Sequence, residues 1–131
     1  MRTVTLLPRM TQILVMDDDP GMRAMLDQIL KLYGYDVVLA ANGKEGLELF
    51  RSRKVDLVIS DLYMPEKEGL ETIKEIHRDS PEVPIIAMSG KQGKTSLLSV
   101  AQHFGAARIL VKPFNPQDLL TAVEEVLKLK S

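Results

Sequence analysis

Five short runs of apolar residues are spaced along the chain, and each has the length of a β-strand. They lie within residues 12–16, 36–40, 56–60, 83–88 and 108–111 and are rich in Val, Ile and Leu. Apolar and polar positions do not alternate in them, which is typical of strands buried on both faces of a parallel sheet. We therefore expect a sheet of five parallel strands.

Between these runs, apolar residues recur at intervals of three and four, the spacing of one buried helix face. The helical segments are residues 20–33, a segment capped by Asn42, residues 67–78, a weaker one at about 94–104, and residues 116–129. Pro20 suits a first helical turn, and Gly34 suits the position where a helix stops. Strand and helix patterns thus alternate five times.

This alternation predicts an α/β fold in which helices cover both faces of the sheet through right-handed crossovers. For a doubly wound, flavodoxin-like sheet of five parallel strands, we expect the strand order 2-1-3-4-5. Ligands of such sheets bind beyond the C-terminal ends of strands 1 and 3, where the direction of winding reverses. The residues at those two strand ends are therefore the first candidates for a functional site.

Acidic side chains gather at both of these strand ends. Asp17 and Asp18 follow the first strand, and Asp61 ends the third. Neighbouring carboxylates repel one another unless a cation compensates, so their convergence favours a metal site. Oxygen ligands without Cys suit a hard cation such as Mg²⁺. Asp19 lies past the strand end and is better explained as the cap of the following helix.

Two further polar side chains end the fourth and fifth strands. Ser89 adds a hydroxyl, and Lys112 adds an ammonium between Val111 and Pro113. A divalent ion together with a lysine stabilises a phosphoryl group. An Asp carboxylate can itself be the nucleophile that accepts phosphate. The strand ends therefore predict phosphoryl-transfer chemistry.

Composition narrows the classes of function. The 131 residues carry a formal net charge of −1, so no basic field argues for nucleic acid. The absence of Cys excludes a disulfide framework and a thiolate metal site. No apolar run is long enough to span a bilayer, and the N-terminus lacks the apolar region of a secretory signal. We expect a cytoplasmic protein without membrane contact.

Four segments resemble the signatures of bacterial response-regulator receiver domains. They are ILVMDDDP, LVISDLYMPEKEG, IIAMSG and ILVKPF, each at a strand end and in the family's order. The resemblance covers roughly residues 11–129. It implies a receiver of the chemotaxis-regulator type. We expect residues 1–10 to be a flexible leader and residues 11–131 to be the receiver domain, with no effector domain, so that the protein is either a stand-alone receiver or a fragment of a larger regulator.

The resemblance implies a role for each acid. Asp61 would accept the phosphoryl group and contribute to the metal site. Asp18 would bind Mg²⁺ directly, and Asp17 would act on the metal mainly through water. The backbone carbonyl of Tyr63 would be a further metal ligand.

The resemblance also implies roles for the other polar residues. Lys112 would pair with Asp61 at rest and with the phosphoryl group afterwards, and the Lys112–Pro113 peptide bond would be cis. Ser89 would donate a hydrogen bond to the phosphoryl group. An aromatic residue often stands three positions before the lysine in this family, whereas this chain has Ile109, so we expect no aromatic switch.

The implied function is phosphoacceptance in two-component signal transduction. A sensor histidine kinase or a histidine phosphotransfer protein would donate the phosphoryl group. The surface of helix 4, strand 5 and helix 5 would then bind an unknown downstream protein. We expect a monomer at rest that can dimerise when phosphorylated. Beyond its own phosphorylation and dephosphorylation, we expect no enzymatic activity.

Other functions remain open from the residues. A pseudo-receiver would act only as a protein-binding module. An aspartyl-phosphate phosphatase would use an Asp-x-Asp motif, which Asp17–Asp19 fits, but the short loops leave little room for a substrate pocket. A flavin carrier of the same fold needs a Ser/Thr-rich phosphate loop, whereas the acids after the first strand would repel phosphate.

Overall fold

Five strands form one parallel sheet in the order β2-β1-β3-β4-β5, which confirms the predicted fold class and strand order. The computed structural model describes residues 10–62, 68–90, 102 and 105–130. The strands are β1 (Gln12–Met16), β2 (Asp36–Ala40), β3 (Leu57–Asp61), β4 (Ile85–Ser89) and β5 (Arg108–Val111). β3 and β4 begin one and two residues later than their apolar runs suggest.

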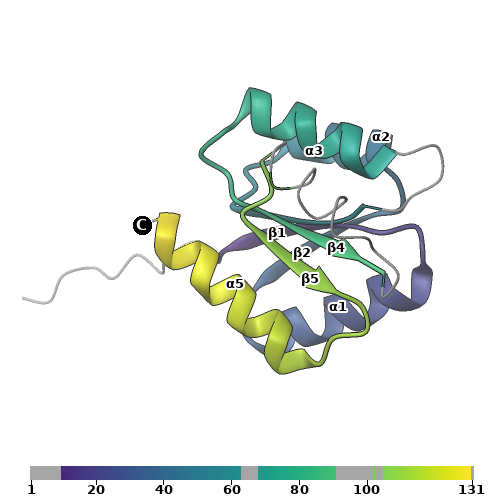
Figure 1. The fold of residues 1–131 in the computed structure, drawn as a ribbon, viewed down its shortest axis with the longest axis vertical. Helices are drawn as coiled ribbons and strands as arrows, with labels where there is room; N and C mark the ends of the chain where they lie inside the picture. The colour runs from purple at the N-terminus through teal and green to yellow at the C-terminus, as the bar shows by residue number, and fades with distance from the viewer. Residues whose placement is uncertain (1–9, 63–67, 91–101, 103–104, 131) are drawn as a thin grey trace, which may run out of the picture.

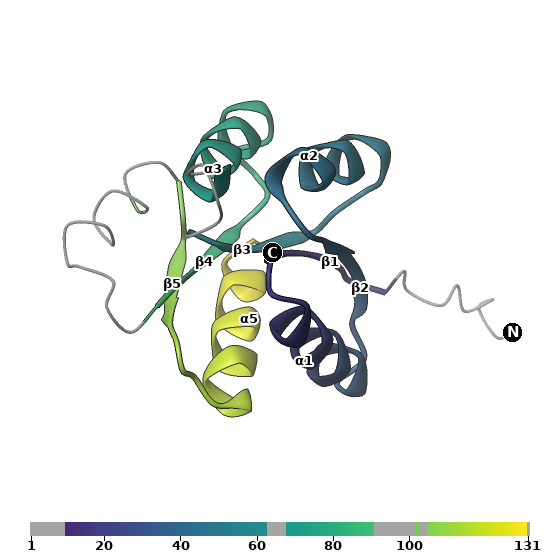
Figure 2. The same ribbon diagram turned by 90° about the vertical axis from the view of Figure 1, so that its right-hand side faces the viewer.

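Helices cover both faces of the sheet. They are α1 (Pro20–Leu32), α2 (Gly43–Ser52), α3 (Glu68–Asp79) and α5 (Pro116–Lys130). α2 and α3 lie on one face, and α1 and α5 lie on the other (Figures 1 and 2). Nearly all of the helix expected at residues 94–104, and residues 1–9 of the expected leader, lie outside the described residues. Among the described helices, none has the length and apolar character needed to cross a membrane.

The sheet separates two apolar cores. In β1, Leu14 and Met16 face the core beneath α2 and α3, while Ile13 and Val15 face the core beneath α1 and α5. Successive strand residues point to opposite faces, so a strand that is buried on both needs apolar residues throughout. This explains the uninterrupted apolar runs of β1, β3 and β4. β2 and β5 lie at the sheet edges and are less buried.

The helix ends follow local sequence signals. Asp19 caps α1 by accepting a hydrogen bond from the Gly21 N–H at 3.0 Å. Gly34 follows the end of α1 with φ 92°, a conformation that glycine adopts without strain. Asn42 caps α2 by accepting from the Glu45 N–H at 2.8 Å. The predicted caps thus place the start of α1 directly after the acidic strand end.

The apolar stripe predicted along residues 20–33 is only partly buried. Leu26 and Leu30 are fully buried in the core, as the spacing indicates. Met25 and Tyr33 also fit the spacing of three and four residues in this segment, but they are 36% and 60% exposed. A helix that packs on a sheet buries a narrower strip of its surface than its sequence pattern alone suggests.

Candidate functional site

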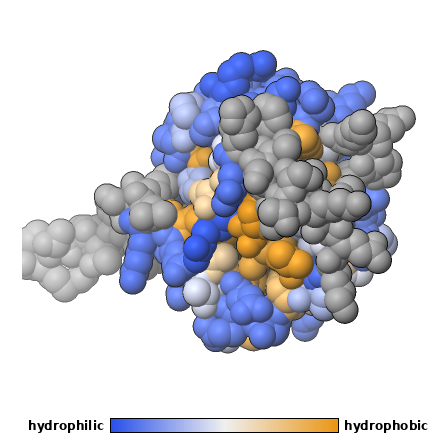
Figure 3. All heavy atoms as spheres, viewed as in Figure 1, coloured by the Kyte–Doolittle hydropathy of each residue, from blue (hydrophilic) through white to orange (hydrophobic). Residues whose placement is uncertain are grey.

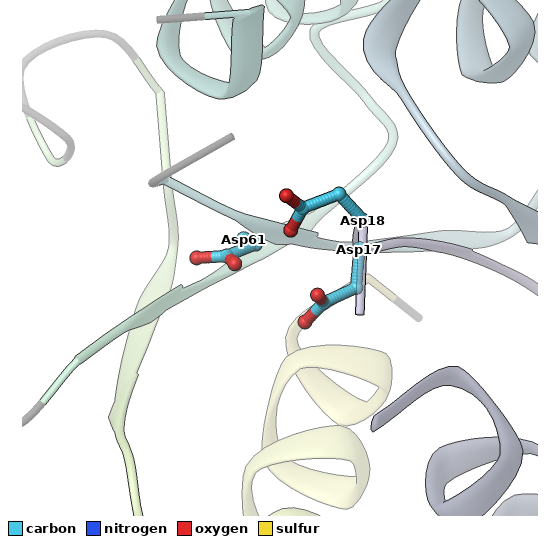
Figure 4. A group of neighbouring side chains, drawn as sticks. All are labelled: Asp17, Asp18 and Asp61. Carbon is cyan, nitrogen blue, oxygen red and sulfur yellow. The ribbon is translucent and has the colours of Figure 1, made fainter. Parts of the chain in front are cut away.

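Three carboxylates converge at the C-terminal edge of the sheet. Asp17 and Asp18 follow β1, Asp61 is the last residue of β3, and one oxygen from each lies within 4.8 Å of the others (Figure 4). β1 and β3 pair in parallel with Met16 opposite Ser60, so Asp17 and Asp61 occupy the next positions of adjacent strands. Asp17 and Asp61 are buried, whereas Asp18 is exposed.

Hydrogen bonds hold Asp17 through its main chain and its side chain. Its N–H donates to the Ala40 carbonyl at 3.1 Å, and its carbonyl accepts from the Arg23 guanidinium at 2.7 Å. Its carboxylate accepts from the Asp19 N–H at 2.9 Å and from the Lys112 ammonium at 3.0 Å. Asp17 is therefore fixed from β2, α1 and the end of β5.

Lys112 brings a positive charge to the cluster from the end of β5. Its Nζ lies 3.0 Å from Asp17 Oδ2 and 3.2 Å from Asp61 Oδ2. Burial lowers the pKa of Lys112, but the hydrogen bond to Asp17 and the charges of Asp61 and Asp17 outweigh burial and raise it. The Lys112–Pro113 peptide bond is cis, as the resemblance implies. The contact with Asp17 is an addition to the expected pairing with Asp61.

Ser89 is the last residue of β4 and is fully buried. β4 lies beside β3 with Met88 opposite Asp61, so Ser89 stands one position beyond the partner of the candidate acceptor. Its hydroxyl donates to the Gly90 carbonyl at 3.4 Å. A hydrogen bond from Ser89 to a phosphoryl group on Asp61 would require that hydroxyl to change partners, so this role stays a prediction.

The acid cluster fits a magnesium ion by the chemistry of its donors. Three carboxylates offer hard oxygen atoms in one small volume, and one of them belongs to an exposed side chain. Mg²⁺ prefers one or two carboxylates and keeps several waters, which an exposed position such as that of Asp18 allows. Tyr63, whose carbonyl is the fourth predicted ligand, lies outside the described residues.

Close packing of α3 also shapes the site. A Cβ atom on Gly69 would lie 2.1 Å from the carbonyl oxygen of Asp61 and 2.9 Å from that of Leu62. Only a residue without a side chain lets the first turn of α3 approach the main chain of Asp61 so closely. The first turn of α3 thus packs directly against the main chain at the end of β3.

The sequence pattern also did not identify the contact between the Arg23 side chain and Asp17. It lies in the first turn of α1, where a positive charge opposes the helix dipole. That unfavourable placement is a signal that the side chain has another partner, and the structure identifies this partner as the Asp17 carbonyl.

Comparisons with known proteins agree on one family. The family model described as "Response regulator receiver domain" matches residues 13–124. The chemotaxis protein CheY of Thermotoga maritima is 37% identical over 118 residues, which cover 89% of this chain and 98% of that protein. A CheY-like receiver domain protein from Methanospirillum hungatei JF-1 superposes with a TM-score of 0.88 at 30% identity, covering 93% of this chain and 97% of the other.

Longer proteins match as well. The probable transcriptional regulator ycf27 of Porphyridium aerugineum is 35% identical over 117 residues. These residues cover 89% of this chain but only 48% of that regulator. The chain therefore spans about half of one curated relative and nearly all of another.

Proposed function

Since this chain belongs to the family of response regulator receiver domains, we propose that it is a phosphoacceptor in two-component signal transduction, with Asp61 as the acceptor. Receivers are generally regulatory, and we propose that this one catalyses only its own phosphorylation and dephosphorylation. The observation that carries the proposal is the Lys112 ammonium shared between Asp17 and Asp61 beside the exposed carboxylate of Asp18. The site thus combines a candidate nucleophile in Asp61, a cation in Lys112 and hard oxygen ligands for a metal.

The proposed reaction forms an acyl phosphate. A carboxylate oxygen of Asp61 attacks the phosphorus of a phosphohistidine on a sensor kinase or a phosphotransfer protein. The P–N bond breaks, and the imidazole nitrogen leaves with the electron pair and takes up a proton. Lys112 would move from the carboxylate to the phosphoryl oxygens, and Ser89 would donate a hydrogen bond to them.

The metal site in this proposal consists of Asp17, Asp18 and Asp61 with the backbone carbonyl of Tyr63. When bound, Mg²⁺ supplies positive charge that stabilises the phosphoryl oxygens during transfer. Asp17 has both carboxylate oxygens engaged by Asp19 and Lys112. This supports an indirect role through water for Asp17 and direct binding by the exposed Asp18.

The proposed output surface lies at β5 and α5. A groove of about 660 Å³ there is lined by Ile109, Val111 and Phe114 together with residues of α5, and the Val111 side chain is 48% exposed. Figure 3 shows apolar residues gathered on this face. We propose that phosphorylation shifts the population of a two-state surface formed by β5, α5 and the helix expected at residues 94–104, most of which lies outside the described residues. An unknown protein would then bind one of the two states.

The remaining parts of the proposal concern setting and scope. Residues 11–131 would act as the receiver unit in the cytoplasm. We propose that this unit binds neither nucleic acid nor a membrane. It would be monomeric at rest and able to dimerise when phosphorylated.

Intact mass spectrometry tests the proposal. The protein is incubated with acetyl phosphate, with and without Mg²⁺, as wild type, as Asp61→Asn, and as Asp79→Asn, which alters an exposed acid of α3. We expect a metal-dependent gain of one phosphoryl group in wild type and Asp79→Asn, and no gain in Asp61→Asn. If the wild type takes up no phosphoryl group under conditions that label a known receiver, the proposal is wrong. The protein would then be explained as a pseudo-receiver that acts only by binding other proteins.

A further inference from the structure

Arg23 occupies a position that helix electrostatics disfavours. It lies in the first turn of α1, which contains no acidic residue, and the positive end of the helix dipole repels a cation there. Within the described part of the chain, its guanidinium is not within ion-pair distance of a carboxylate. The side chain therefore needs a different explanation from a surface salt bridge.

Arg23 holds the acidic loop at two peptide groups. Its guanidinium donates to the Asp17 carbonyl at 2.7 Å, a short, charge-assisted hydrogen bond. Its backbone N–H donates to the Asp19 carbonyl at 3.0 Å. The bond to the Asp17 carbonyl requires the arginine side chain, whereas the bond to the Asp19 carbonyl is the first i→i−4 bond of α1 and would form with another residue at position 23.

We propose that Arg23 is a positioning residue for the metal ligands. Its guanidinium fixes the Asp17 carbonyl, directly before Asp18, so that the Asp18 carboxylate points toward Asp61 before any metal arrives. The inference rests on the proposed function for its biological meaning, but its physical content is the order of the loop of residues 17–19. A loop ordered in advance binds a ligand without first losing conformational freedom.

Positioning and simple electrostatics predict opposite effects of removing Arg23. Loss of a positive charge beside three carboxylates should, by Coulomb's law alone, tighten the binding of Mg²⁺. Loss of a group that orients metal ligands should weaken it, by roughly tenfold for many outer-shell residues. The sign of the change in Kd therefore separates the two explanations.

The experiment compares Arg23→Met with Arg53→Met, which removes an exposed arginine just after α2 and so serves as the control for net charge. Isothermal titration calorimetry gives the Kd for Mg²⁺ without any phosphodonor. Hydrogen exchange of the metal-free proteins gives the protection of the Asp19 amide, which donates to Asp17 Oδ1. The Ile86 amide in the centre of the sheet reports on global stability.

We expect Arg23→Met to raise the Kd for Mg²⁺ by roughly tenfold and to speed exchange at Asp19 while leaving Ile86 unchanged. Arg53→Met should leave both readouts near the wild-type values. An unchanged or lower Kd in Arg23→Met, or equal acceleration at Asp19 and Ile86, would overturn the inference. If Arg23→Met does not fold, Arg23→Lys keeps the charge without the planar fork, and it should still raise the Kd and speed exchange at Asp19.

These readouts are independent of phosphorylation. A wild-type protein that binds Mg²⁺ but takes up no phosphoryl group would end the proposed function and leave the role of Arg23 intact. If the wild type does not bind Mg²⁺, the metal site fails, and the exchange rate of Asp19 in the metal-free proteins still decides whether Arg23 orders the loop.

Discussion

Asp17 and Lys112 form an ion pair of 3.0 Å although 95 residues separate them in the sequence. The same ammonium lies 3.2 Å from Asp61. Lys112 therefore compensates two buried carboxylates at once and stands where a metal ion would also act. Its removal should change both the stability of the fold and the affinity for the metal.

We expect Lys112→Met to lower the free energy of unfolding without metal by about 2–3 kcal/mol, less than for a fully buried pair because Lys112 is 21% exposed. It should also bind Mg²⁺ more tightly than wild type, since a competing cation is gone. Urea unfolding and calorimetric titration measure the two effects. Lys44→Met, at an exposed position of α2, is the control, and equal behaviour of both variants would contradict the prediction.

The stabilising effect of Lys112 should disappear at alkaline pH. The pKa of Lys112 is raised above its ordinary value of 10.5 because its carboxylate partners outweigh burial. A group whose pKa is raised on folding contributes fully below the pKa of the unfolded chain and is lost as the pH rises through the folded pKa. The difference in unfolding free energy between wild type and Lys112→Met should therefore be constant between about pH 8 and pH 10 and shrink above about pH 10.

Urea titrations of both metal-free proteins between about pH 8 and pH 11.5 would measure this difference. Comparing the two proteins cancels the contribution of Tyr35, whose pKa is raised by burial and by the charge of Glu124. A difference that grows with pH would reverse the expected sign and refute the assignment.

Asp18 and Asp19 should have different roles although they are adjacent in the sequence. We expect Asp18→Asn to weaken Mg²⁺ binding by at least about tenfold, because it removes an exposed carboxylate ligand with little loss of stability. Asp19→Ala should cost about 1 kcal/mol of stability through the lost cap of α1. It should leave the Kd for Mg²⁺ within about threefold of wild type, because the Asp19 N–H that binds Asp17 is retained. Weaker Mg²⁺ binding in Asp19→Ala, with wild-type binding and lower stability in Asp18→Asn, would contradict this assignment of roles.

The close approach of α3 to Asp61 predicts a penalty for any side chain at Gly69. A Cβ there would lie 2.1 Å from the Asp61 carbonyl oxygen, so α3 or the end of β3 must move. We expect Gly69→Ala to cost about 1–3 kcal/mol and to slow labelling of Asp61 by acetyl phosphate.

The matched control for Gly69→Ala is Gly21→Ala. In α1 a Cβ at Gly21 meets nothing closer than Asp19 Oδ1 at 3.4 Å, so this change should be neutral or stabilise slightly. Equal costs for the two variants in urea unfolding would show that close packing on β3 is not the cause.

The sequence predicted the elements whose signals are local. Uninterrupted apolar runs identify β1, β3 and β4 because each of these strands is buried on both faces of the sheet. Pro20 and Gly34 mark helix ends through their backbone preferences, and Asn42 marks one through its capping side chain. The convergence of Asp17, Asp18 and Asp61 then follows from strand order alone. The sheet topology thus determines which side chains come together at the site.

The parts that sequence reasoning missed depend on side-chain conformation. Nothing in the order of residues indicates that Lys112 reaches Asp17 as well as Asp61, because this depends on how a flexible stem crosses the edge of the sheet. The bond from Arg23 to the Asp17 carbonyl likewise arises from a rotamer. The exposure of Met25 shows that helical spacing gives the direction of a face but not its width.

The distance in sequence between Asp17 and Lys112 has a consequence for synthesis of the chain. A ribosome produces both buried acids first and their ammonium only with the last strand, 95 residues after Asp17 and 51 after Asp61. A nascent chain that ends before β5 would carry the carboxylates without this counter-charge and without one edge strand of the sheet. The candidate phosphoacceptor site can therefore assemble only after Lys112 has been synthesised and has left the ribosome.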